Sequence, residues 1–256
     1  IDTDNFKWNS TLNITQNTNE IVEIHPDIAN LGTGASEGFG SRFEVGGSIG
    51  DFYTSMFKRD AQGRIEMDSG VPLKTADPVL AGNAEPDVSL GWANNFNIGE
   101  NLSVGFIINA KFGGKVFSQT ESMLDGNGVS LRSGQARDAG GLTVNAVQGG
   151  AAVTSADPEL WFKAIGDRNG IGEPYIYDRT NIRLSQMSVS YNLDPSSIGL
   201  PVDSASISLI GNNLIYSAKA PFDPELAMAT GRNSQGLDNF NLPSTRTIGM
   251  NLRLTF

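Results

Sequence analysis

The residues best suited to binding chemistry lie between positions 157 and 177, where acidic and aromatic side chains occur close together. The run Asp157-Pro158-Glu159-Leu160-Trp161-Phe162 sets two carboxylates beside two rings, and Tyr175 and Tyr177 follow. Aromatic faces beside acids can stack on a sugar ring and accept hydrogen bonds from its hydroxyls. Trp161, Phe162, Tyr175 and Tyr177 are therefore substrate-contact candidates. The alternative, that Trp161 and Phe162 pack this segment against neighbouring loops or a partner, is favoured.

Other kinds of site chemistry find less support. Asp167-Arg168-Asn169-Gly170 offers oxygen ligands for calcium, but it lacks the spacing and closing glutamate of a twelve-residue calcium loop. The single histidine, His25, ends a weak strand pattern, and the chain contains neither cysteine nor a G-x-S-x-G motif. We expect no catalytic residue, no cofactor and no metal, with a structural calcium ion in the loops as the weaker alternative.

Charge and composition limit the class of protein that must position these residues. Lysine and arginine number 18 against 28 acidic residues, a net charge of −10, which opposes a nucleic-acid partner. The 30 glycines and 11 prolines are typical of many strands joined by turns. No apolar run of about 18 residues occurs, so an α-helical membrane span is excluded and only a closed β-barrel could cross a bilayer.

The clearest strand pattern lies at the end of the sequence. Ile248, Met250, Leu252, Leu254 and Phe256 alternate with polar residues or glycine, a period of two that indicates a strand with one apolar face. An aromatic last residue on that face resembles the assembly signal of outer-membrane barrels. The alternative is an ordinary last strand of a β-sandwich.

Similar alternation predicts further strands at 6–15, 90–98, 102–110, 182–193 and 205–216, with a hairpin turn at 99–101. Ile182 and Leu184 are out of phase with Met187 and Val189, which predicts a β-bulge near Ser185. Weaker patterns at 20–25, 42–45 and 49–58 bring the expected total to about nine strands.

Connection lengths alternate between short and long along this series, and the longest connection runs from position 118 to about 180. Outer-membrane barrels have short periplasmic turns and long external loops, so the pattern favours an antiparallel transmembrane barrel portion over a soluble sandwich. Trp8, Trp92 and Tyr191 lie on the apolar faces and would then form interfacial girdles. Core packing in a soluble sheet is their alternative role.

Several strings resemble the C-terminal β-barrel region of SusC-like (RagA-like) TonB-dependent outer-membrane transporters. They occur in family order and span nearly the whole chain. They are Phe6-Lys7-Trp8, Gly46-Gly47-Ser48-Ile49-Gly50-Asp51-Phe52-Tyr53, Gly82-Asn83-Ala84-Glu85-Pro86, Tyr177-Asp178-Arg179-Thr180-Asn181-Ile182-Arg183-Leu184, Ile210-Gly211-Asn212-Asn213-Leu214 and the ending from Pro243.

This resemblance implies that residues 1–256 are the C-terminal part of a barrel of about 22 strands, without the plug domain and the N-terminal strands. It also implies import of oligosaccharides or peptides in the cell outer membrane, energised through TonB. The implied partners are the remaining barrel and plug, in the same or a separate chain, a SusD-like lipoprotein lid, TonB acting through the plug, and the lipid bilayer. It implies no enzymatic activity.

Two other functions stay open at this point. The chain could be a soluble carbohydrate-binding or adhesive β-sandwich domain, or the barrel component of a surface assembly or secretion complex. Dependence on detergent for solubility separates the sandwich from either barrel.

Overall fold

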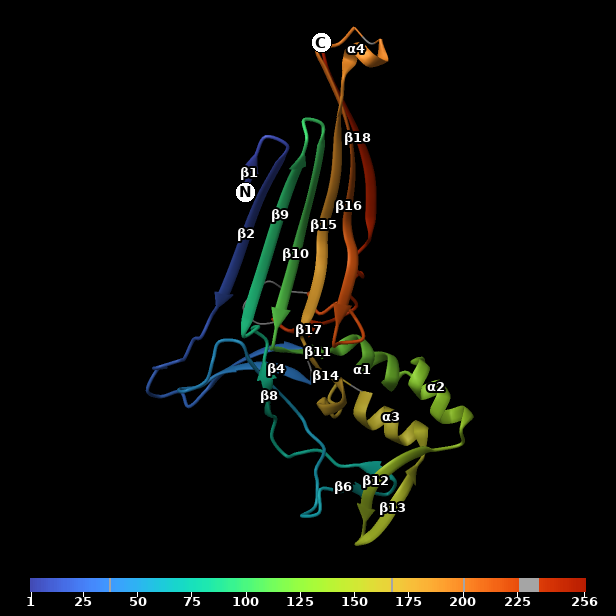
Figure 1. Cartoon of the computed structure of the whole chain (residues 1–256). Coiled ribbons are helices and arrows are strands. Elements are labelled where there is room, and N and C mark those ends of the chain that lie inside the picture. The colour runs from blue at the N-terminus through green and yellow to red at the C-terminus, as the bar shows by residue number, and fades with distance from the viewer. Residues whose placement is uncertain (37, 167, 200, 226–234) are drawn as a thin grey trace.

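One large antiparallel sheet dominates the computed structural model, which describes residues 1–256 except positions 37, 167, 200 and 226–234. Six strands of this sheet are long and one is very short, and Figure 1 shows them side by side. In spatial order they are β1 (Asp2–Thr3), β2 (Phe6–Gln16), β9 (Val88–Ile98), β10 (Leu102–Phe112), β15 (Asn181–Leu193), β16 (Ser204–Ala218) and β18 (Thr247–Thr255).

The strands follow the period-two pattern of the sequence, and the predicted bulge is present. Leu184 pairs with Ile108 and Gln186 with Ile107, so Ser185 is the extra residue between them. On its other side β15 shifts register against β16 between Leu184 and Gln186. The bulge brings Ile182 and Leu184 onto the same face as Met187 because it inserts one residue into the alternation.

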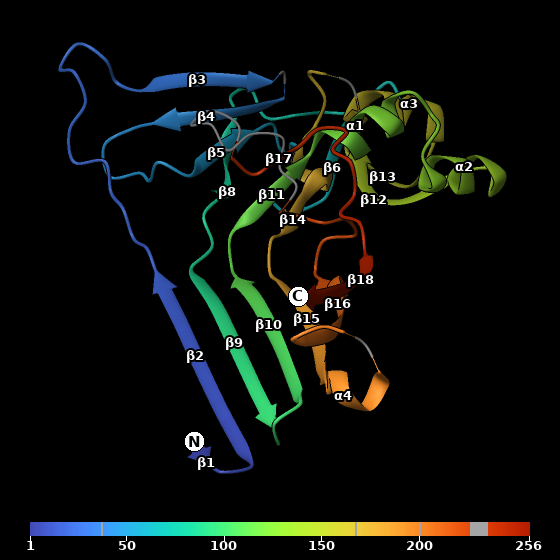
Figure 2. The same ribbon diagram turned by 90° about the horizontal axis from the view of Figure 1, so that it is seen from above.

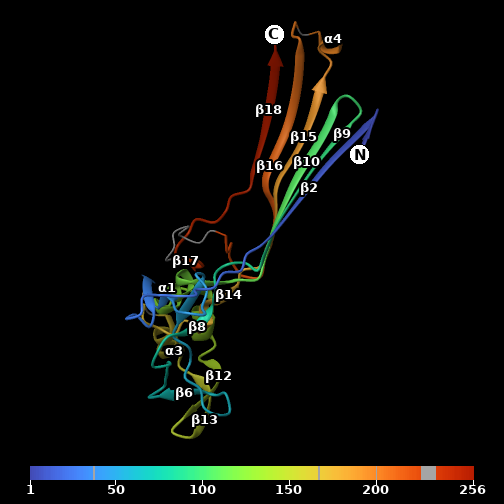
Figure 3. The same ribbon diagram turned by 90° about the vertical axis from the view of Figure 1, so that its left-hand side faces the viewer.

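The two ends of the sheet differ in how strands are connected. The connections of β1 to β2, β9 to β10 and β15 to β16 lie at one end, where Gly99 adopts a φ of 61° in the β9–β10 turn. The connections formed by residues 17–87, 113–180 and 219–246 lie at the other end (Figures 1 and 3). The expected one-ended distribution of long connections is therefore confirmed.

The prediction that the weaker patterns at 20–25, 42–45 and 49–58 form strands of the large sheet was wrong. Residues 20–25 form no strand, and the other two patterns correspond to β4 (Phe39–Phe43) and β5 (Asp51–Thr54) of a separate small sheet. Within the described residues the large sheet thus has six long strands where about nine were expected. Short patterns such as the one at 49–58 fit a strand of a soluble core as well as a membrane strand, and alternation alone does not separate the two.

The long connections fold together into a compact unit, here called the cap, formed by the described residues of 17–87, 113–180 and 219–246. One cap sheet has the order β3 (Leu31–Ser36), β4, β5, β8 (Val79–Asn83). A second has the order β13 (Ala151–Ala156), β12 (Leu142–Gln148), β6 (Ile65–Asp68), β7 (Val71–Pro72). A third has the order β14 (Ile176–Asp178), β11 (Lys115–Ser118), β17 (Leu237–Asp238).

Short helices complete the cap and lie beside these sheets (Figure 2). They are α1 (Gln119–Gly126), α2 (Leu131–Asp138), α3 (Pro158–Gly166) and the 3-10 turn η1 (Glu173–Tyr175). A further one-turn helix, α4 (Pro195–Ile198), lies at the far end of the large sheet. Ser118 and Ser130 cap α1 and α2 by accepting the Glu121 and Ser133 amides, which offsets the unpaired amides of each first turn. No helix in the described ranges is long and apolar enough to cross a membrane.

The buried hydrophobic cluster lies within the cap. Phe39 contacts Phe52 and Phe117 at ring-centroid distances of 5.0 and 5.6 Å, and Phe57 contacts Trp161 at 5.5 Å. These rings come from connections far apart in the sequence, so their burial joins the cap into one body. The large sheet, by contrast, leaves nearly all of its apolar side chains at least partly exposed.

Candidate substrate-facing surface

The large sheet has two chemically distinct faces, which neighbouring cross-strand rows make plain. One row, read from β2 to β18, is Trp8, Phe96, Val104, Val189, Leu209, Met250. The next row, one residue along each strand, is Lys7, Asn97, Ser103, Ser190, Ser208, Asn251. Successive residues of a strand point to opposite faces, so the sheet is apolar on one side and hydrophilic on the other.

The apolar face has no protein layer against it. Ile248, Met250, Leu252 and Phe256 are all strongly exposed, and Phe256 retains 83% of its surface. A sheet face with exposed apolar side chains on neighbouring strands is unusual in a soluble monomer and indicates an interface with lipid or another protein. These terminal residues share the apolar face of β18, while their contact with lipid and their role as an assembly signal stay predictions.

The hydrophilic face is rich in asparagine and serine. Ser103 donates to Asn97 and Asn109 donates to Ser185, both at 2.7 Å, so neighbouring strands are linked by side chains as well as by backbone. The charged residues of the six long strands are all basic: Lys7, Lys111, Arg183 and Arg253. The face offers hydrogen-bonding groups to water or a polar solute and carries no carboxylate of its own.

Ion pairs connect this hydrophilic face to the cap. Arg183 on β15 contacts Asp223 at 2.7 Å, with both side chains nearly buried, and Arg183 also lies over the Tyr216 ring at 4.8 Å. Lys111 on β10 contacts Glu225 at 3.4 Å. A buried, hydrogen-bonded pair is strongly destabilised by loss of one partner, so this contact fixes the 219–225 segment against the strand ends.

Three of the four substrate-contact candidates are buried in the cap core. Trp161, Phe162 and Tyr175 retain only 7%, 5% and 0% of their surface. The Tyr175 hydroxyl donates to Asp125 Oδ2 at 2.8 Å, and Tyr177 donates to Glu121. These positions match the packing alternative for Trp161 and Phe162, because a buried ring presents no face to a solute.

Asp125 connects these tyrosines to the helices. It is fully buried at the end of α1 and accepts from Ser130 at 2.5 Å and from Arg132 Nε at 2.8 Å. Burial, with the Asp125 charge and hydrogen bond next in importance, raises the pKa of Tyr175. Burial and then the Glu121 hydrogen bond raise the pKa of Tyr177. The network is a structural one that joins α1, α2 and β14.

The three aromatic girdle candidates all lie on the apolar face. The Trp8 indole donates to Asn94 Oδ1 and the Trp92 indole to Ser10 Oγ, both at 3.0 Å, and Tyr191 is exposed on β15. Indole N–H groups on a lipid face need a partner, and these hydrogen bonds provide one. Placement of the rings at a membrane interface stays a prediction.

Metal chemistry finds no support in the described part of the chain, where no group of three or more histidine or acidic side chains converges. Asp167, the first residue of the calcium-loop candidate, lies outside the described residues. His25 is exposed in a segment without regular structure, and its Nδ1 accepts the Asp27 amide at 3.3 Å.

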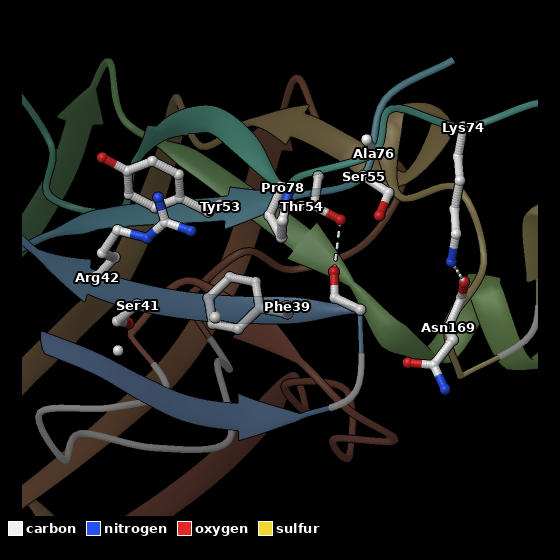
Figure 4. A pocket seen from close by; sticks show the side chains of 13 residues that line it. Phe39, Ser41, Arg42, Tyr53, Thr54, Ser55, Lys74, Ala76, Pro78 and Asn169 are labelled. Carbon is white, nitrogen blue, oxygen red and sulfur yellow. Dashed lines mark hydrogen bonds between the residues drawn. The ribbon is translucent and has the colours of Figure 1, made fainter. Parts of the chain in front are cut away.

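A cavity of about 430 Å³ lies in the cap beside β4 and β5, and sequence reasoning missed it. Figure 4 shows Arg42 stacked on Tyr53 at one side and Lys74 bonded to Asn169 at the other. These residues come from separate parts of the 17–87 connection and, through Asn169, from the 113–180 connection, so no local motif marks the site. The string 46–53 contributes Tyr53 to the lining, but in the sequence it indicates only the family resemblance.

Comparison with known proteins adds to this geometry. No protein-family model matches the chain. It is 25% identical to TonB-dependent receptor P3 of Formosa agariphila and 26% identical to TonB-dependent receptor P26 of the same organism, over 98% and 99% of its own length. The chain resembles a SusC/RagA-like TonB-dependent receptor.

Solved structures share the fold. The RagAB peptide importer in its closed-closed state covers the whole chain with a TM-score of 0.66 at 16% identity, and the open-open state does so with 0.65 at 12%. The chain spans about a quarter of these receptors, 27% and 28% of the two Formosa proteins and 28% and 27% of the RagAB chains. The predicted antiparallel barrel portion is thus confirmed as a fold, and the barrel is not closed by the described strands.

Proposed function

We propose that this chain forms part of the wall, and part of the external cap, of an outer-membrane transporter for nutrients. The observation that carries the proposal is the pair of neighbouring rows across β2 to β18, one wholly apolar and the next wholly hydrophilic. A sheet with these faces is stable when lipid contacts one side and a polar lumen the other. The similarity to TonB-dependent receptors supports the same arrangement.

The open edges of the sheet support a larger barrel. In the described residues β18 pairs only with β16, and β2 pairs with β9 and the two-residue β1. Unpaired backbone groups are not tolerated in a hydrocarbon layer, so further strands must pair with both edges. We propose that this chain supplies the C-terminal strands, and that the remaining strands and the plug come from the same or a separate chain.

We further propose that the solute is an oligosaccharide or a peptide, that TonB supplies energy through the plug, and that a SusD-like lipoprotein covers the cap. The similarity to the RagAB peptide importer supports the peptide class, and the similarity to TonB-dependent receptors supports TonB as the energy source. In this proposal the lipid-facing and lumen-facing sides of the sheet form a wall and catalyse no reaction. The relatives are receptors and importers, in agreement with an expected role without enzymatic activity.

The test is uptake by cells carrying the complete receptor. Deletion of the receptor should abolish accumulation of a fluorescent oligosaccharide or peptide, re-expression should restore it, and deletion of TonB should abolish it again. The receptor should fractionate with the outer membrane and purify together with a lipid-anchored protein of the SusD type. Unchanged uptake after deletion of the receptor would remove the transport proposal.

A further inference from the structure

The cap cavity has the size of a small-ligand site. Its volume of about 430 Å³ lies within the range that such sites occupy, about 300 to 1,000 Å³. Phe39 and Tyr53 form buried apolar surface beside it, and Thr54 and Ser55 add hydroxyls. The Thr54 hydroxyl donates to the Gly38 carbonyl, which leaves its oxygen able to accept a further hydrogen bond.

The described residues that line the cavity carry a net charge opposite to that of the chain. The sequence carries a net charge of −10, yet the described lining includes Arg42 and Lys74 and no carboxylate. Among the described residues neither cation has a carboxylate within ion-pair distance. Arg42 lies 4.5 Å over the Tyr53 ring, and Lys74 Nζ donates to the Asn169 carbonyl at 2.5 Å.

Arg42 and Lys74 are both oriented by neighbouring groups and keep hydrogen-bond donors for a ligand. Stacking on Tyr53 orients the Arg42 guanidinium without neutralising it, and the planar group keeps donors for an oxyanion. The Lys74 ammonium uses one of its three N–H donors on the Asn169 carbonyl, so the other two can bind a ligand. Figure 4 shows the two cations on opposite sides of the cavity, with Thr54 and Ser55 between them.

We propose that this cavity binds the acidic group of an anionic carbohydrate, a carboxylate or a sulfate ester, with Arg42 and Lys74 as the recognition residues. The inference rests on the proposed transport function and names its substrate class. The hydroxyls and the Asn169 amide suit sugar hydroxyls, while the two cations select the charge. A charge-assisted contact with each cation would favour an acidic sugar over its neutral counterpart.

Binding to the complete receptor in detergent provides the test. Titration calorimetry would compare a trigalacturonate with its methyl ester, a sulfated trisaccharide with its unsulfated form, and an acidic tripeptide. At low salt at least one acidic sugar should bind about tenfold more tightly than its neutral counterpart. Equal binding of acidic and neutral sugars, or tighter binding of the acidic peptide, would overturn the proposal.

Two variants locate the effect. Arg42→Gln should weaken binding of the acidic sugar about tenfold while leaving the neutral form unchanged. Lys74→Gln should act in the same direction, and because Lys74 is exposed its loss should not disturb folding. Lys163→Gln, which removes an exposed cation paired with Glu159 on α3, is the matched control and should bind normally. Normal binding by both cavity variants would overturn the assignment.

Uptake separates this inference from the transport proposal. If the receptor does not transport, uptake of every solute is unaffected by its deletion. If the receptor transports but the cavity has no role, uptake of the acidic sugar depends on the receptor and is unchanged by Arg42→Gln. The expected result is receptor-dependent uptake that Arg42→Gln reduces for the acidic sugar alone.

Discussion

At the scale of single residues, the cap depends on a few buried polar groups that have partners in distant segments. Asp125 accepts hydrogen bonds from Ser130, Arg132 and Tyr175, which lie in two different parts of the chain. Such groups are strongly destabilising once a partner is lost, because a buried charge remains unpaired. The tyrosines suggested as sugar contacts therefore serve first to hold the cap together.

Removal of the buried carboxylate should unfold the cap locally. Asp125→Ala leaves Arg132 and Tyr175 without their acceptor and should cost about 3–5 kcal/mol of cap stability. Tyr175→Phe removes one of several hydrogen bonds and should cost only about 1–2 kcal/mol. Limited proteolysis of the receptor in detergent measures both changes, and equal resistance of wild type and Asp125→Ala would contradict the role given to this network.

Alkaline pH should loosen the same region. Folding raises the pKa of Tyr175 and of Tyr177, mainly through burial, above the ordinary value of about 10. Their contribution is therefore fully present below pH 10 and is lost as the pH rises toward the folded values. Protease sensitivity of the cap should increase above about pH 10, and Tyr177→Phe should weaken this dependence. A cap whose sensitivity is flat up to pH 12 would argue against the assignment.

At the scale of elements, the six long strands could be predicted and the cap could not. Period-two alternation persists over about ten residues in each membrane-length strand, as from Ile248 to Phe256, and even the bulge at Ser185 follows from a phase change. Cap strands are two to seven residues long and pair across large sequence distances, as β6 does with β12 in parallel. Neither local alternation nor turn residues carry that information.

The same limit applies to the candidate site. Aromatic residues near acids make Trp161 and Phe162 candidates for sugar contact, but their burial depends on α3 packing against α1 and Phe57. Arg42 and Lys74 carried no local signal, because only the fold brings them to one cavity. Burial and long-range juxtaposition are properties of the tertiary structure.

The close crossing of α1 and α3 gives a prediction for two helical glycines. A Cβ on Gly166 would lie 2.3 Å from the Gly126 nitrogen and 2.6 Å from the Ser122 carbonyl oxygen, both backbone atoms. Gly166→Ala should therefore separate the helices and cost about 1–3 kcal/mol. Gly134→Ala on α2, where the nearest atom is 4.0 Å away, should be neutral or stabilising. Thermal unfolding of the cap compares them, and equal midpoints would contradict the close packing.

At the scale of the whole molecule, the sheet and the cap differ in where their apolar side chains lie. The cap buries its hydrophobic residues internally, while the sheet leaves an entire apolar face uncovered. Figure 3 shows the sheet extending away from the cap, so the cap does not cover that face. The sheet is therefore stable only with lipid or protein against its apolar side.

The last residue offers a test of assembly in the membrane. Removal of the exposed Phe256 from the complete receptor should reduce its level in the outer membrane, because an aromatic end on the lipid face is the proposed assembly signal. Removal of the exposed Val129 side chain in the cap, by Val129→Ser, is a matched control and should leave the level unchanged. An unchanged outer-membrane level of the Phe256 deletion would count against the signal.

The most direct test of the central claim is the environment of four neighbouring positions in the complete receptor, with any cysteines outside these 256 residues replaced by serine, reconstituted into lipid vesicles. Spin labels would be attached at Val189, Leu209, Ser190 and Ser208, which belong to the two adjacent rows. We predict that labels at Val189 and Leu209 collide with oxygen dissolved in the lipid, and labels at Ser190 and Ser208 with a water-soluble nickel chelate. Contact of all four labels with the chelate, or burial of Val189 and Leu209 away from both reagents, would contradict the account.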